Sequence, residues 1–122
     1  HIIDLLAAIG KGELKDALSG VASLAASGVS AELLVHQLLH FSRAILLFRF
    51  QSDAKHSLRQ QMGDELTAQL GKLRGTSGRH LNAAWVRELI TALHDTKRAH
   101  LAFLPLELAI ITHLETVVVH KH

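Results

Sequence analysis

Apolar residues recur along the chain at the three- and four-residue spacing of amphipathic helices. The stretch from Ala31 to Phe50 holds 13 apolar residues out of 20 and contains neither Gly nor Pro. On a 3.6-residue period four of its polar residues, Glu32, His36, His40 and Arg43, share one narrow arc, and almost all other positions are apolar. We therefore expect the central helix of a bundle, with most of its circumference covered by other elements.

Two shorter helices are expected before the central one, from Ile2 to Ile9 and from Glu13 to Ser27. The segment 10–12 contains two glycines that suit a left-handed helix end. Ser30 is a good N-cap for the central helix. Gly20 costs its helix about 1 kcal/mol relative to Ala, so either a neighbouring helix approaches closely there or the helix is weak.

The chain after Phe50 is more polar, with a break at residues 51–53. Between residues 54 and 74 an apolar stripe continues, but Gly63 and Gly71 divide it into short helices, and the pattern leaves the fold of residues 54–79 open. An amphipathic helix with Trp85 on its apolar side follows from about Asn82 to Ala102.

Pro105 is expected to separate the last two helices, because the residue before a proline is disfavoured in a helix and Pro itself suits a first turn. The final helix is predicted from Leu106 to about His120, with apolar residues on more than one face.

Composition supports an all-α class, because Leu and Ala supply 39 of the 122 residues and aromatic residues are 4%. The length is that of one domain. We predict a single α-helical domain over residues 1–122, built as a bundle of five to six helices. The chain begins at His1 rather than Met, so we expect it to be a piece of a longer protein.

The charge pattern argues against a membrane or direct nucleic-acid role. Glu32, Arg43 and Arg49 would each cost roughly 2.5–3.5 kcal/mol near a bilayer centre, so a membrane span is rejected. The 13 Lys and Arg form no run longer than Lys97 and Arg98, and the net charge is +2. A DNA-binding module therefore ranks last among the functions considered, for want of a basic face. Zero Cys excludes thiolate chemistry and is compatible with a cytoplasmic domain.

His36 and His40 are four residues apart, a spacing at which two imidazoles on one helix face can share a zinc ion. Gln37 stands where the metalloprotease pattern needs Glu, and no third ligand can be placed from the sequence. A paired polar stripe explains the same residues. No phosphate-binding loop, dinucleotide fingerprint or nucleophile elbow is present, so we predict no catalytic residue and no cofactor.

Two strings resemble the collar region of the bacterial DNA polymerase III tau/gamma clamp-loader subunits. The first is AAIGKGELKDALSGVASLAASGVSAELLVHQLLHFSRAILL, and the second is LHDTKRAHLAFLPLELAIITHL. In the second, Pro105 precedes a Leu-Glu helix start, as in the family's final segment. The resemblance spans about Ile2 to Val119, whereas residues 52–79 match only in being helical.

The resemblance implies an α-helical oligomerisation and scaffold domain that holds clamp-loader subunits together during DNA replication. It implies contacts with further copies of the subunit, with the delta and delta-prime subunits and, by extension, with the accessory psi protein, and contact with DNA only through the whole complex. The family's AAA+ module and its zinc module are absent from this chain. No ATPase function can therefore be assigned to its residues.

The helices at 31–50 and 106–119 carry more apolar surface than a small bundle needs, which commonly marks a protein interface. The predicted interface residues are Leu104, Pro105, Leu106, Glu107, Leu108, Ile111, Phe48 and Phe50. The alternative function is a helical metal-binding or regulatory adaptor domain centred on His36 and His40.

Overall fold

The computed structural model of the protein describes residues 1–51, 53–75 and 78–119, with side chains as far as Glu115. Ser52, Thr76, Ser77 and the chain end after Val119 lie outside the described residues. Within the described part the secondary structure is entirely helical. Its seven helices are α1 (Ile2–Lys11), α2 (Leu14–Ala26), α3 (Ala31–Phe50), α4 (Ala54–Met62), α5 (Asp64–Gly71), α6 (Ala83–Thr96) and α7 (Leu104–Val119).

The all-α class is confirmed, and the expected five to six helices become seven in the described chain. Residues 54–71 form two of the seven helices and divide at Gly63, as expected, where the φ of +88° is accessible to glycine at little cost. The predicted N-cap at Ser30 is confirmed, because its hydroxyl accepts a hydrogen bond from the Leu33 amide at 3.1 Å. Helix α1 ends two residues later than the predicted end at Ile9, and Gly12 caps it in the left-handed region with φ +79°.

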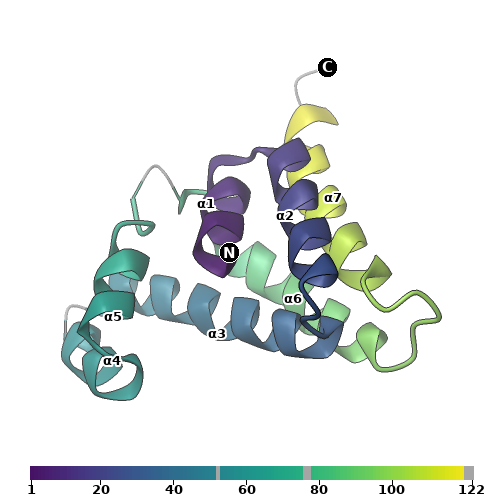
Figure 1. Ribbon diagram of the computed structural model, residues 1–122. Helices are drawn as coiled ribbons and strands as arrows, with labels where there is room; N and C mark the ends of the chain where they lie inside the picture. Colours follow the sequence, from purple (N-terminus) through teal and green to yellow (C-terminus); the bar gives the residue numbers. More distant parts are fainter. Residues whose placement is uncertain (52, 76–77, 120–122) are drawn as a thin grey trace.

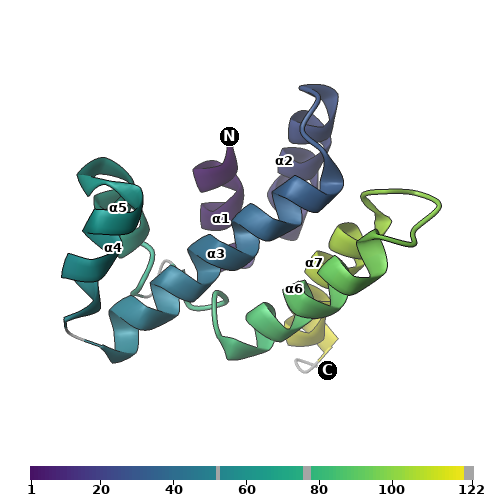
Figure 2. The same ribbon diagram turned by 90° about the horizontal axis from the view of Figure 1, so that it is seen from below.

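The longest helix, α3, runs across the domain and organises the other elements (Figures 1 and 2). Helices α1 and α2 form an antiparallel pair on one side of it, while α6 lies along α3 and carries α7 on its far side. Helix α7 also packs against α2. The α4–α5 hairpin lies apart from these elements, at the C-terminal end of α3 (Figure 1).

Gly20 allows α1 and α2 to approach closely. A Cβ atom at this position would lie 3.3 Å from Cδ1 of Leu5, a side chain that is itself fully buried. Of the two explanations that the sequence left open for Gly20, the close approach is therefore confirmed.

Helix α3 is less enclosed than the sequence suggested. Its buried side, which includes Leu34, Leu38 and Ile45, faces the core, but the opposite side stays open, with Leu33 exposed and Phe50 80% exposed. By length and composition α3 could cross a membrane, although 44% of the relevant window is buried inside the domain. That partial burial is the pattern of a bundle's core helix.

A small polar network joins α1, α7 and the start of α6 inside this apolar core. His80 is buried, and both its backbone amide and its Nδ1–H donate to the Gly10 carbonyl, at 3.1 and 3.0 Å. His113 Nε2–H donates to the His80 carbonyl at 2.7 Å. The ring of His113 also stacks at a tilt on Trp85, with 5.4 Å between centroids. The network therefore fixes three elements against each other.

This network predicts a loss of stability in mild acid. Burial lowers the pKa of His113, and its hydrogen bond to the His80 carbonyl offsets part of that shift. As pH falls below about 6.5, the unfolded chain takes up a proton that the folded chain resists, so the free energy of unfolding decreases until the lowered folded-state pKa is passed. We expect His113→Gln to reduce this decrease between pH 7.5 and pH 5.0, as measured by urea unfolding.

The control for this prediction is His40→Gln, which removes an exposed histidine from α3. It should retain the decrease seen in the parent chain. A His113→Gln chain whose stability falls as steeply as that of the parent would show that His113 is not responsible.

Candidate protein interface

The surface of interest begins where α6 ends and the chain turns back into α7. The predicted helix over residues 82–102 extends six residues too far, because α6 already ends at Thr96. The Thr96 hydroxyl donates a hydrogen bond to the Ala92 carbonyl at 2.6 Å. Turns follow, with the Arg98 amide donating to the Asp95 carbonyl at 3.0 Å. Because α7 packs back along α6 (Figure 2), the chain needs this loop to reverse its direction.

Helix α7 starts at Leu104, two residues earlier than predicted, and Pro105 occupies its first turn. That position suits proline, because the first amides of a helix have no partner within it. The inward face contains Leu106, Ala109 and Ile110, all of which belong to the core. The opposite face carries Leu104, Leu108 and Ile111, which are exposed or half-buried.

Exposed leucines meet at this turn. Leu101, Leu104 and Leu108 expose 62%, 40% and 51% of their surface. They border a hollow of about 380 Å³ that is lined by Asp95, Arg98, Ala99, His100, Leu101, Leu104, Pro105 and Leu108. An apolar centre with charged residues at its edge is typical of protein–protein contact surfaces. We call Leu101, Leu104, Pro105 and Leu108 the turn patch.

The structure divides the predicted interface residues into three groups. Leu106 and Phe48 are buried in the domain's own core, contrary to the exposure that an interface residue needs, so they offer little surface to a partner. Pro105, Glu107 and Ile111 are half-buried, and Leu104, Leu108 and Phe50 are exposed. Phe50 ends α3 beside α4, away from the α6–α7 turn (Figure 1), so it does not belong to the turn patch.

His36 and His40 lie on α3 as predicted, His36 half-buried and His40 exposed. Among the residues that the structure describes, no group of three His, Cys, Asp or Glu side chains could hold a metal ion. The pair therefore gains no further ligand from the described part of the fold.

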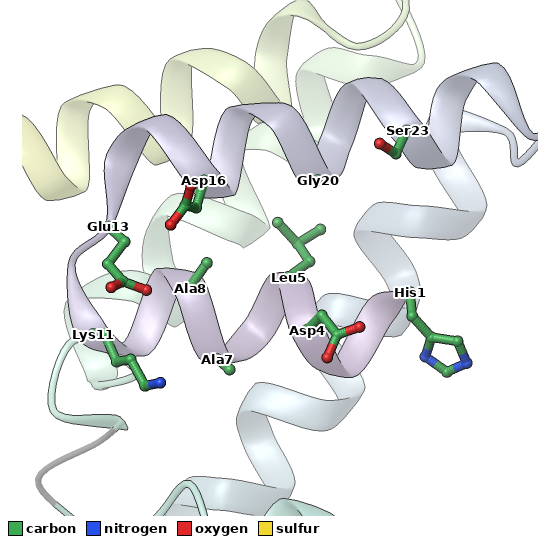
Figure 3. A pocket seen from close by; sticks show the side chains of 10 residues that line it. All are labelled: His1, Asp4, Leu5, Ala7, Ala8, Lys11, Glu13, Asp16, Gly20 and Ser23. Carbon is green, nitrogen blue, oxygen red and sulfur yellow. The ribbon is translucent and has the colours of Figure 1, made fainter.

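A second hollow, of about 360 Å³, runs between α1 and α2 (Figure 3). In the figure the side chain of Leu5 points across it towards Gly20, and Asp16 on α2 points towards α1. Three carboxylates border this hollow, from Asp4, Glu13 and Asp16, against the side-chain ammonium group of Lys11 and the N-terminal residue His1. Its border is therefore mainly acidic, unlike the apolar turn patch.

The comparison with protein families decides the identity of the chain. The sequence model described as DNA polymerase III subunits gamma and tau domain III matches residues 1–118. The chain belongs to this gamma and tau domain III family. Neither the curated proteins nor the solved structures gave a match. The resemblance that the sequence suggested is confirmed, and it extends through the α4–α5 region that the quoted strings did not cover.

Domain III of gamma and tau is a non-catalytic helical domain of the clamp loader, which acts in DNA replication. The turn patch offers apolar contact area with charged residues at its border. The domain's place in a clamp-loader subunit also implies association with other clamp-loader subunits.

Sequence reasoning missed one residue of the turn patch and one structural anchor elsewhere in the fold. Leu101 was expected inside a helix, so its exposure could not be predicted until the early end of α6 was known. Arg49 was read only as a charge that disfavours a membrane, whereas its guanidinium donates to the carbonyls of Arg74, Gly78 and Leu81. A single arginine near the end of an apolar helix was the available signal.

Proposed function

We propose that this domain III is an oligomerisation and scaffold domain of the clamp loader, and that its turn patch is a subunit contact. The observation that carries the proposal is the cluster of three exposed leucines around one hollow at the α6–α7 turn. Exposed apolar surface with polar residues at its border is a common mark of protein contact sites. We further propose that the 122 residues form one domain of a longer cytoplasmic AAA+ subunit whose ATPase module lies outside this chain.

The partners proposed are further copies of the same subunit together with the delta, delta-prime and psi subunits. The outward face of α7 is suited to them, because Leu104, Leu108 and Ile111 project from one rigid helix whose inner face is fixed in the core. A partner that covers this face would bury apolar area without any rearrangement of the domain. Such preorganisation limits the entropy lost on association.

The double substitution Leu104→Asp with Leu108→Asp tests the contact. We expect it to weaken association by at least about 30-fold, since an apolar anchor replaced at the centre of an interface costs about 2 kcal/mol or more. The measurement is sedimentation equilibrium over a wide concentration range, first with the 122-residue chain alone and then with delta-prime added. Both leucines are exposed, so the fold should survive, as far-UV circular dichroism can verify.

A matched control carries the same added charge on another surface. Ala83→Asp with Ile90→Asp changes two exposed residues of α6, and neither residue lines the turn patch. This control should associate like the parent chain. Association that persists in a folded Leu104→Asp, Leu108→Asp chain would exclude the turn patch. A parent chain that stays monomeric and ignores delta-prime would contradict the scaffold function.

A further inference from the structure

The basic residues are scattered along the sequence but not evenly over the molecule. Seven of the 13 Lys and Arg residues lie between Arg43 and Arg79, together with only three of the 11 Asp and Glu residues. That segment therefore has a formal charge of +4, and the rest of the chain, with six basic and eight acidic residues, has −2. The segment covers the end of α3, the α4–α5 hairpin and the start of the following loop.

Three of these basic residues border one hollow. Its volume is about 210 Å³, and it is lined by Phe48, Lys55, Thr67, Ala68, Gly71, Lys72 and Arg74. Lys55 comes from α4, whereas Lys72 and Arg74 follow directly after α5. All three basic residues are exposed. We call Lys55, Lys72 and Arg74 the basic rim.

The acidic residues of the segment lie elsewhere, since none of them lines the hollow. Oδ1 of Asp64 lies 3.9 Å from Nε of Arg59. Asp64 and Glu65 both occupy the first turn of α5. There they complement the partial positive charge of the helix N-terminus. The hollow lies at the opposite end of α5, beside Gly71. Asp53 precedes α4 and is not among the lining residues.

We propose that the basic rim binds the phosphate backbone of DNA. Lys and Arg side chains from separate segments of the chain that border one hollow form the electrostatic pattern by which proteins hold phosphate groups. The aromatic lining residue, Phe48, is buried in the core, so the hollow offers charge and not a stacking surface for bases. Binding is therefore independent of base sequence.

The sequence, which contains no basic run, ranks direct DNA contact last because it predicts no basic face. The fold produces such a face by folding α4 and α5 into a hairpin, which brings Lys55 beside residues that follow it by 17 and 19 positions. The basic rim is on and just after the α4–α5 hairpin, and the turn patch is on the α6–α7 loop and α7, so the two surfaces can be tested separately.

The test is fluorescence anisotropy of labelled single-stranded and duplex oligonucleotides with the 122-residue chain, repeated over a range of salt concentrations. The variant carries Lys55→Gln, Lys72→Gln and Arg74→Gln. If three phosphates are contacted, the slope of log K against log salt should become less negative by about 2 units for single strands or about 3 for duplex. The form of DNA whose salt slope reaches its expected change is the form that the rim holds.

The matched control removes the same three charges elsewhere, through Lys15→Gln, Arg87→Gln and Lys97→Gln, all of which change exposed residues. It has the same net charge as the rim variant and should keep the parent slope. Circular dichroism checks that both variants fold. In addition, Leu104→Asp with Leu108→Asp should leave the salt slope unchanged, which separates this proposal from the proposed scaffold function.

Three results would overturn the proposal. The first is that the chain binds neither form of DNA at low salt. The second is an equal loss of affinity in the rim variant and its matched control, which would indicate only the overall charge of the domain. The third is loss of self-association in the rim variant with unchanged DNA binding, which would identify an acidic protein surface as the partner, such as the hollow between α1 and α2.

Discussion

Replacing Trp85 with Ala is expected to lower the free energy of unfolding by about 3–5 kcal/mol. Trp85 is fully buried, and its Nε1–H donates to the Ser42 hydroxyl at 3.1 Å, so it joins α6 to α3 as well as filling the core. Its ring also contacts His113 on α7. A domain of this size has about 5–15 kcal/mol of stability in total, so the loss should be visible in both urea and thermal unfolding.

Two further variants separate the contributions of Trp85. Trp85→Phe retains most of the ring volume but removes the indole donor, so it should cost less than Trp85→Ala. Ile90→Ala truncates an exposed residue on the same helix and should change stability by no more than about 0.5 kcal/mol. Unfolding is followed by circular dichroism, because Trp85 is the only tryptophan in the chain. Similar losses for Trp85→Ala and Ile90→Ala would show that the core does not depend on this residue.

The helices whose ends carry a local chemical signal were predicted well. Gly12 and Ser30 act through their own backbone angle or side chain, so their effect can be read without knowledge of the fold. The burial of Trp85 was also predicted, because it follows from the apolar stripe on which it lies. In each case the signal lies within the residues of a single helix or its ends.

The predictions that failed depended on contacts between distant segments. The end of α6 at Thr96 is set by the need to turn back along its partner α7, and the residues after Thr96 do not themselves forbid a helix. The burial of Leu106 and Phe48 depends on which helix lies against each face. A sequence read one segment at a time can identify an apolar face, but it cannot tell whether the domain's own helices cover that face.

The same limit explains why the candidate surfaces were only partly foreseen. Leu104 and Leu108 were expected at an interface, and the structure leaves them exposed. The exposure of their neighbour Leu101 could not be predicted without the loop that follows α6. The basic rim could not be predicted without the α4–α5 hairpin, because the sequence left the fold of that region open. Function in this domain therefore depends on which surfaces remain uncovered after packing.

Arg49 leads to the second large effect. Its Nε donates to the Arg74 carbonyl at 2.7 Å, and its two terminal nitrogens donate to the carbonyls of Leu81 and Gly78. Burial lowers the pKa of the guanidinium, but an arginine side chain remains charged in proteins. Arg49→Met removes all three bonds and leaves partly buried carbonyls unpaired, so we expect a loss of about 2–4 kcal/mol in the free energy of unfolding.

Controls on the same helix and at the same position test this assignment. Arg43→Met removes an exposed arginine of α3 and should cost no more than about 0.5 kcal/mol. Arg49→Lys keeps the charge but lacks the planar guanidinium that reaches several carbonyls at once. Its free energy of unfolding should therefore lie between those of the parent chain and Arg49→Met. Equal stability of Arg49→Met and Arg43→Met would refute the anchoring role.

The effect of Arg49 should extend beyond α3, because the segment that it anchors contains His80. The amide of His80 donates to the Gly10 carbonyl, and the carbonyl of His80 accepts from His113, so the anchor supports contacts of both α1 and α7. Hydrogen exchange at the His80 amide should therefore accelerate more in Arg49→Met than exchange at the amides of α2. Helix α2 serves as the comparison because Arg49 makes no hydrogen bond to it. Equal acceleration in both places would instead mean that Arg49 acts only through global stability.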